Sequence, residues 1–264
     1  MIIMLWPLAA LFGLLGLAIG SFLNVVIYRM PREQSIMFPA SRCPGCETKL
    51  KRRHNVPVLS WLALRGKCAY CREPISPRYP LVEAATAALF VAVTLRFGLS
   101  MALPAYLYLA AISITLAVIA ADNMRLPDTL VLPSYVLAVL LLMPAGAGIG
   151  DWHPAARAFA GMAALSAIYF ALTLAYPTTL NLADVKLAGL LGLYLGWMSW
   201  AALLVGTLGG LVIGALGGGV RIALQQSGRG ARLTVGPCMV VATGLAVFVT
   251  VPVTTWYASV LAVT

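Results

Sequence analysis

The sequence predicts an all-α polytopic membrane protein of about eight transmembrane helices, with a cytoplasmic, zinc-ribbon-like loop inserted near its N-terminus. Of the 264 residues, 61% are hydrophobic and only 10% are charged, and the mean hydropathy is +0.93. Soluble domains carry about 25% charged residues, so a bilayer is the natural medium for this composition. Apolar stretches recur along most of the chain. One polar interval, residues 27–80, holds four of the five cysteines and 11 of the 18 Lys and Arg residues.

The first expected span covers residues 5–26 and is a retained helix with its N-terminus outside. No Lys or Arg precedes it, it is longer than a signal-peptide core, and the first basic residues, Arg29 and Arg32, follow it. Gly16 and Gly20 stand four residues apart, a spacing that lets another helix approach closely. We therefore expect this helix to stay in the membrane and to pack against a neighbour.

Residues 27–80 are expected to form a cytoplasmic loop that binds zinc. Two C-x-x-C pairs, separated by 21 residues, supply the ligands Cys43, Cys46, Cys68 and Cys71. Each pair makes a tight turn that presents two thiolates, and two such turns complete the tetrahedron that Zn²⁺ prefers. A reducing cytoplasm disfavours disulfides, and a small loop with little hydrophobic core needs a bound metal to stabilise its fold. Because four thiolates leave no open position for water, we expect the zinc to be structural.

Seven further spans are expected within a transmembrane domain of residues 81–264. Their approximate ranges are 81–95, 103–121, 130–147, 156–176, 185–198, 201–217 and 238–259. Several are shorter than the roughly 20 residues that a perpendicular helix needs, and the stretch 185–217 can also be drawn as one bent hairpin. The predicted divisions are therefore the first helix (1–26), the loop (27–80) and this domain.

Positive charge sets the expected orientation. With a cytoplasmic loop, eight alternating spans place 16 of the 18 Lys and Arg residues on the cytoplasmic side and only Arg96 and Arg157 outside. The basic stretch 49–53 is expected to determine topology and to contact anionic lipid. Nucleic-acid binding is not expected, because no aromatic platform accompanies the charge.

Four carboxylates at or inside span ends are functional candidates, because ionisable groups are costly at a membrane. They are Glu83, Asp122, Asp128 and Asp184. Asp128 lies in a turn before a helix and is expected to be its N-cap. Glu83, at the start of a span, is expected to gain from the helix dipole or to pair with a loop arginine. Asp122 and Asp184 remain as the candidate pair, although the residues alone leave that choice open.

Two facing carboxylates can hydrolyse a peptide bond. Like charges a few ångströms apart do not both ionise cheaply, so the pair shares one proton near neutrality. The ionised member takes a proton from water, and the protonated member polarises the scissile carbonyl. Lys186, two residues after Asp184, is expected to reach lipid phosphates or to favour the ionised form of a neighbouring carboxylate.

Several segments together resemble the motifs of one enzyme family. They are Gly20–Pro31, both cysteine pairs, Asn55–Trp61, Arg65–Cys68, Ile75–Glu83, Asp122 with Leu126-Pro127-Asp128, and Asp184-Val185-Lys186-Leu187. The family is that of the type IV prepilin peptidases, also called prepilin leader peptidases or N-methyltransferases. The resemblance implies an aspartyl endopeptidase of the bacterial inner membrane with Asp122 and Asp184 as its catalytic residues.

The same resemblance implies substrates and cofactors. Such enzymes cut the basic leader from prepilins and type II secretion pseudopilins at the cytoplasmic border of the membrane. Members with the four-cysteine loop commonly also methylate the new N-terminus with S-adenosylmethionine, so we expect both activities. No motif identifies the methyl-donor site. Supporting or substrate-binding candidates are Gly20, Asn24, Glu83, Asp128 and Lys186.

The second aspartate motif departs from the family pattern. The family usually carries Gly-x-Gly before this aspartate, whereas this chain has Asn181-Leu182-Ala183 before Asp184. Glycine permits backbone conformations and close approaches that other residues restrict. The later Gly236-Pro237 also resembles a family motif, with Val235 where an aromatic residue is usual. How Asn181 and Ala183 hold Asp184 is therefore a question for the structure.

Three other functions stay open from the residues alone. A proton-coupled transporter would use Asp122 and Asp184 as relay groups, but it predicts an inverted repeat and midplane carboxylates, and the sequence shows neither. A non-catalytic scaffold of a pilus or secretion system would need no catalytic geometry. A general intramembrane aspartyl protease shares the pair but has no need of the basic zinc loop.

Overall fold

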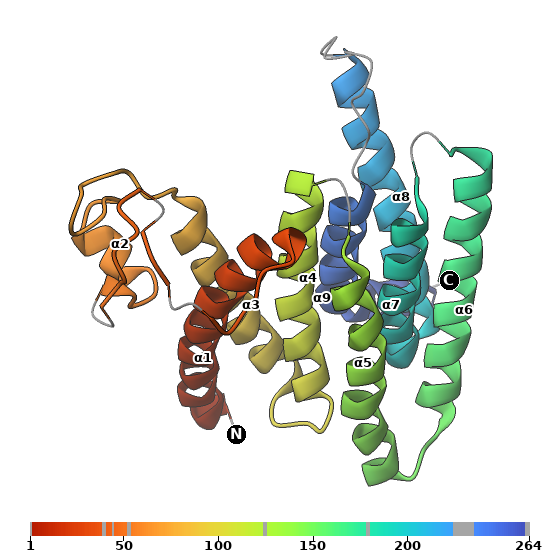
Figure 1. Cartoon of the computed structure of the whole chain (residues 1–264). Helices are drawn as coiled ribbons and strands as arrows, with labels where there is room; N and C mark the ends of the chain where they lie inside the picture. The colour runs from red at the N-terminus through yellow and green to blue at the C-terminus, as the bar shows by residue number, and fades with distance from the viewer. Residues whose placement is uncertain are drawn as a thin grey trace. The chain divides into compact units, whose positions relative to one another are not determined.

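The computed structural model describes an all-helical chain (Figure 1) over residues 2–38, 41–43, 45–51, 54–123, 126–177, 180–223 and 235–261. The elements are α1 (Ile2–Arg29), η1 (Met30–Arg32), α2 (Leu59–Ala63), α3 (Arg78–Phe97), α4 (Leu103–Asn123), α5 (Asp128–Ile149), α6 (His153–Ala175), α7 (Leu182–Met198), α8 (Trp200–Ala223) and α9 (Val235–Leu261). Each expected span overlaps one of the eight helices α1 and α3 to α9. The predicted fold class, a helical membrane protein with a cysteine loop, is therefore confirmed.

Six of the described helices are long and apolar enough to cross a membrane. They are α1, α3, α4, α5, α6 and α8. α7 has only 17 residues, and the apolar stretch Val235–Thr250 of α9 is also short. Ser199 alone separates α7 from α8, and its hydroxyl accepts the Ala202 amide at 2.9 Å, so this stretch forms two helices joined at one residue.

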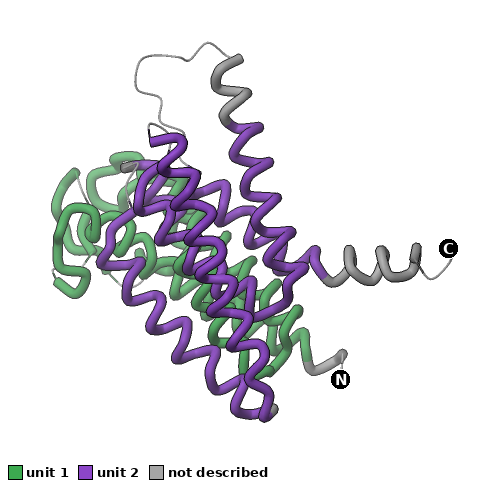
Figure 2. The backbone as a smooth tube through the Cα atoms, turned by 90° about the vertical axis from the view of Figure 1, so that its right-hand side faces the viewer, with its two compact units in different colours: residues 1–115 green, residues 116–264 purple. Residues whose placement is uncertain are grey.

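The chain divides into two compact units, residues 1–115 and 116–264 (Figure 2). The boundary falls inside α4, so the end of α4 belongs with the later helices. The division predicted from the sequence, at residues 26 and 80, separates polar from apolar stretches. The two units instead group helices that pack against one another.

α1 and α3 pack closely in the first unit through glycines of α1. A Cβ atom at Gly16 or at Gly20 would lie 2.7 Å from an α3 backbone Cα. This confirms the close helix approach expected from the spacing of the two glycines. Asn24, one turn later, donates from its side chain to the Tyr79 carbonyl at 3.1 Å. Gly20 and Asn24 therefore join α1 to α3.

α7 is the central helix of the second unit, with contacts to α5, α6, α8 and α9. Every residue from Leu187 to Trp197 is buried. At its C-terminal end, the Arg157 guanidinium of α6 donates to the carbonyls of residues 196–198 at 2.6 to 2.9 Å. A cation there satisfies carbonyls that have no partner within the helix. α7 is thus a fixed support for the aspartate in its first turn.

Candidate functional site

The structure brings the four predicted metal ligands together. The sulfurs of Cys43, Cys46, Cys68 and Cys71 all lie within 4.8 Å of one another, and the Cys43 and Cys71 sulfurs are 3.7 Å apart. In a tetrahedral zinc site with Zn–S bonds of about 2.3 Å, the sulfurs are roughly 3.8 Å apart. The cluster therefore fits one metal ion held by four thiolates.

Each cysteine pair lies in a small hairpin closed by one β-bridge, Arg42 to Lys49 in the first and Lys67 to Pro74 in the second. In both hairpins the amide of the first cysteine donates across the turn, at 3.1 and 2.8 Å. The residue after the second cysteine has a positive φ in both, 54° and 61°. Two equivalent turns thus present two thiols each, which is the arrangement that the C-x-x-C spacing predicts.

The thiols differ in how readily they ionise. Hydrogen bonds from the Thr48 hydroxyl and amide lower the pKa of Cys46 to about 6. For Cys71, a backbone hydrogen bond from Glu73 lowers the pKa, but burial and the neighbouring thiols raise it to about 12. Negative charge on one sulfur disfavours charge on the next. A cation would remove this conflict, because metal ligation deprotonates every thiol.

Glu83 anchors the loop to α3 from a position deeper in the helix than predicted. It lies beyond the first turn of α3, is 8% exposed, and accepts the Val58 amide at 2.7 Å. The predicted position in the first turn, beside the helix dipole, is therefore wrong, and the carboxylate instead holds a backbone amide of the loop; its pairing with a loop arginine stays a prediction. Val58 has a φ of 59°, which is costly for a β-branched residue. The buried carboxylate helps to hold that conformation.

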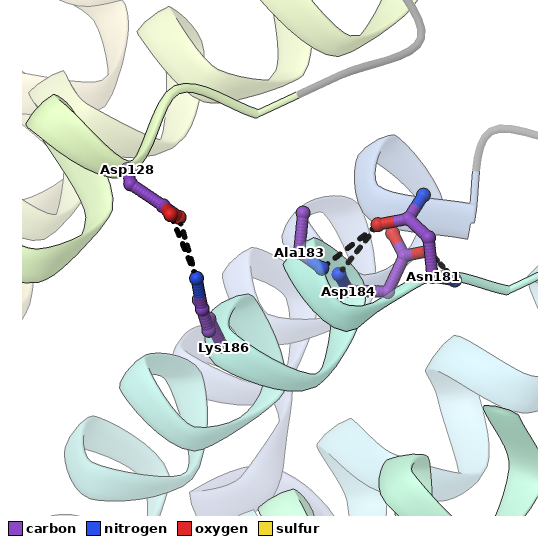
Figure 3. A network of polar contacts seen from close by, with 5 residues as sticks. All are labelled: Asp128, Asn181, Ala183, Asp184 and Lys186. Atoms are coloured by element: carbon purple, nitrogen blue, oxygen red, sulfur yellow. Dashed lines mark hydrogen bonds and ion pairs between the residues drawn. The ribbon is translucent and has the colours of Figure 1, made fainter.

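Asp184 is held by a capping box at the start of α7 (Figure 3). The Asn181 side-chain oxygen accepts the amides of Ala183 and Asp184, at 2.8 and 3.3 Å. In return, the backbone amide of Asn181 donates to Asp184 Oδ2 at 3.0 Å. The reciprocal bonds fix one carboxylate oxygen. Asn181 and Ala183 thereby orient the aspartate without the glycines usual at this position.

The other carboxylate oxygen of Asp184 faces the start of α9. A Cβ atom at Gly236 would lie 3.7 Å from Asp184 Oδ1 and 3.9 Å from Ala120 Cβ. Ala120 is in the last turns of α4, two residues before Asp122. Asp184 is 6% exposed, whereas Asp122 is exposed. Asp184 therefore lies near the last turns of α4, the helix that carries Asp122, but residues two apart do not share a helix face, so the Ala120 contact does not place the two carboxylates together.

Lys186, two residues after Asp184, forms an ion pair with Asp128 (Figure 3). Lys186 Nζ donates to both carboxylate oxygens of Asp128 at 2.8 Å. The N-cap predicted at Asp128 is wrong: Pro127 is the N-cap, and Asp128 is the first residue of α5. Because Pro127 occupies the N-cap position, the Asp128 side chain does not cap the helix and pairs with Lys186 instead. The pair ties the start of α5 to the second turn of α7.

Three residues near Asp184 were not assigned a role from the sequence. Asn181 could have been found, since Asn followed three residues later by an acidic residue is a capping-box signal. Gly236 was singled out only by a motif. Tyr169, 2% exposed on α6, interacts electrostatically with Asp184 and with Cys238. No sequence signal could have joined Tyr169 to Asp184, because helix packing alone brings them together.

Comparison with known proteins gives one consistent family. Residues 14–97 match the family model described as the bacterial peptidase A24 N-terminal domain. A Stutzerimonas stutzeri protein named prepilin leader peptidase/N-methyltransferase is 34% identical over 86% of this chain and 86% of its own length. The Aeromonas hydrophila protein of the same name is 34% identical over 96% of this chain and 94% of its own length.

A Myxococcus xanthus relative, also named prepilin leader peptidase/N-methyltransferase, is more similar but longer. It is 39% identical over 80% of this chain, and the match spans 63% of its length. No solved structure matches the chain.

Proposed function

Because the chain belongs to the prepilin leader peptidase/N-methyltransferase family, we propose that it is an aspartyl endopeptidase of the bacterial inner membrane that removes the leaders of type IV prepilins. Type II secretion pseudopilins are the second proposed substrate class. Asp122 and Asp184 are the proposed catalytic pair. The observation that supports this assignment is the buried, capped carboxylate of Asp184, whose Oδ1 faces Gly236 close to Ala120 of the helix that bears Asp122.

The proposed hydrolysis uses one ionised and one protonated carboxyl group. The ionised group accepts a proton from water as the water oxygen bonds to the scissile carbonyl carbon. The protonated group donates a hydrogen bond to the carbonyl oxygen, and the leaving amine is protonated as the C–N bond breaks. The Asn181 cap holds Asp184 Oδ2 while Oδ1 faces Gly236, so this chain orients the carboxyl oxygen that accepts the proton of water or donates a hydrogen bond to the carbonyl.

We place the cysteine loop and both aspartates at the cytoplasmic border, with the N-terminus outside. The support is the charge distribution, with 16 of 18 Lys and Arg residues on that side in the eight-span arrangement. A basic leader cut from a membrane-held substrate would meet the enzyme at this border. Alkaline phosphatase, which is active only outside the cytoplasm, should be inactive when fused in the loop, and an active fusion would reverse the orientation.

Zinc is the proposed metal of the four-cysteine cluster, in a structural role. The donor set fits it, because four thiolates at tetrahedral spacing are typical of closed zinc sites. When bound, the ion would compensate the thiolate charges and hold the two hairpins together.

N-methylation of the new N-terminus is the second proposed activity. S-adenosylmethionine supplies an electrophilic methyl group when bound. The contacts of Gly20 and Asn24 do not fit a methyl-donor site, since Gly20 packs on the α3 backbone and Asn24 donates to Tyr79. We therefore assign no residue of this chain to the donor and derive no step through it.

Mass analysis of a prepilin after incubation with the reconstituted enzyme and methyl donor tests the proposal. The wild type should yield a product that lacks the leader and carries one added methyl group. Asp122→Asn and Asp184→Asn should abolish cleavage, whereas the matched control Asp151→Asn, which alters the loop before α6, should retain it. An intact substrate with wild-type enzyme would favour a scaffold or a transporter. Normal cleavage by either test variant would remove that aspartate from the catalytic pair.

A further inference from the structure

We propose that residues 33–38 form a membrane-interface anchor, which returns to the bilayer after α1 and inserts Ile36, Met37 and Phe38 among anionic phospholipids. The anchor does not depend on the proposed reaction. It requires only that α1, which is long and apolar enough to do so, crosses the membrane.

The chain reverses direction as soon as α1 and η1 end. Glu33 adopts a left-handed conformation, with φ 56° and ψ 28°, and its amide donates to the Met30 carbonyl at 3.1 Å. The next amide, of Gln34, donates to the Arg29 carbonyl at 3.1 Å. These two bonds form the Schellman arrangement that closes helix ends and turns the chain. The segment that follows therefore does not continue away from the helix.

Arg29 fixes how far the segment returns. Its guanidinium donates to the Ser35 carbonyl at 2.9 Å, which holds Ser35 beside the last turn of α1. The Ser35 hydroxyl in turn accepts the amides of Met37 and Phe38, each at 3.3 Å. Residues 35–38 are therefore a hydrogen-bonded turn at the level of the helix end, and not an extended tail.

This turn presents apolar side chains outward. Met37 and Phe38 are each 75% exposed, and Ile36 is 37% exposed. Consecutive exposed apolar residues of this kind mark a surface that another apolar phase covers. Since a transmembrane helix ends only a few residues earlier, lipid is the apolar phase within reach of the turn.

The polar neighbours of the turn match a headgroup layer. The Arg32 guanidinium lies 4.2 Å from the centre of the Tyr28 ring and donates to the Tyr28 carbonyl at 2.7 Å. Tyrosine is enriched at membrane interfaces, and arginine there binds lipid phosphates. Arg29 and Arg32 outnumber the one acidic residue of the segment, Glu33. This charge favours anionic phospholipid as the occupant over the basic leader of a prepilin.

Tryptophan fluorescence of the full chain in nanodiscs tests the anchor. Phe38→Trp places a reporter at the tip of the turn, and Gln34→Trp places one at the exposed polar position that precedes it. The nanodiscs contain phosphatidylethanolamine and phosphatidylglycerol, brominated either near the headgroup or near the chain end. Emission of the wild type is subtracted, which removes the six native tryptophans.

The added emission of Phe38→Trp should be blue-shifted, quenched most strongly by bromine near the headgroup, and at least about twofold less sensitive to aqueous iodide than that of Gln34→Trp. Equal iodide quenching of the two reporters, with no quenching by brominated lipid, would overturn the proposal. Shielding of Phe38→Trp that appears only after a prepilin is added would overturn it as well, because the surface would then serve the substrate.

Discussion

Asn181 performs, through a side chain, a task for which glycines are usual at this position. Its side-chain oxygen accepts hydrogen bonds from two backbone amides of the first turn of α7. Its backbone amide donates to the Asp184 carboxylate. A capping box satisfies helix amides and restricts the acidic side chain in the same step. The Asn181 backbone amide holds Asp184 Oδ2, and the side-chain bonds that fix the geometry of this turn are ones that a single substitution can remove.

Replacing that cap should lower catalysis more than it lowers stability. Asn181→Ala removes the side-chain acceptor, at a cost of about 1 kcal/mol in helix stability, and loosens the first turn in which the backbone amide of residue 181 meets the Asp184 carboxylate. We expect a several-fold loss in kcat for leader cleavage with little change in KM. Asn181→Ser, which keeps a capping oxygen, should recover most of the rate. Equal rates for both variants and the wild type would show that the cap does not orient the aspartate.

The Lys186–Asp128 ion pair should also contribute to the site. The two side chains are 38% and 55% exposed, so the pair stabilises the fold by no more than about 0.5 to 1 kcal/mol. Its larger effect should be on the separation of α5 from α7. We expect Lys186→Met and Asp128→Asn each to slow cleavage a few-fold, and the reversed pair Lys186→Asp with Asp128→Lys to recover part of the rate. A double-mutant cycle measures the coupling, and strictly additive losses would show that the two side chains act separately.

At the scale of helices, the α1–α3 pair depends on backbone contact. Gly20 sits so close to α3 that a Cβ atom would lie 2.7 Å from the Glu83 Cα. Glu83 in turn holds the Val58 amide of the cysteine loop. A displacement of α3 from α1 would therefore also move the carboxylate that anchors the loop.

A pair of Gly→Ala substitutions separates packing from helix propensity. Alanine raises intrinsic helix stability by about 0.8 to 1 kcal/mol at either position. Gly214→Ala in α8 meets no atom within 4 Å, so it should leave the unfolding temperature unchanged or raise it. Gly20→Ala should lower that temperature, because two helix backbones must separate. Thermal unfolding in detergent measures both, and an unchanged or raised temperature for Gly20→Ala would contradict the close contact.

The helices and the cysteine cluster were predictable because their signals are local. Apolar length predicts a helix wherever the solvent is lipid, and two C-x-x-C pairs predict a shared metal whatever lies between them. The partner of Glu83 and the neighbours of Asp184 were not predictable in this way. Val58 is 25 residues from Glu83, and Tyr169 is on another helix from Asp184. Such contacts follow from how helices pack, which one sequence does not specify.

At the scale of the whole molecule, the metal ligands and the proposed peptidase residues fall into separate units. The four metal ligands and the α1–α3 pair belong to residues 1–115, and Asp122, Asp184 and Gly236 belong to residues 116–264. The proposed peptidase residues and the metal ligands therefore belong to different sets of packed helices.

Removal of the metal should accordingly separate the two activities. Cys43→Ser with Cys68→Ser takes one thiolate from each hairpin, so zinc should be lost and the loop should become sensitive to protease. We expect methylation of the product to disappear while leader cleavage persists at a rate near that of the wild type. Elemental analysis measures the zinc content, and the mass of the product reports both cleavage and methylation. The control is Cys238→Ser, which lies outside the cluster and should keep its zinc. Unchanged zinc in the double variant would refute the metal site, and simultaneous loss of cleavage would show that the second unit needs the first.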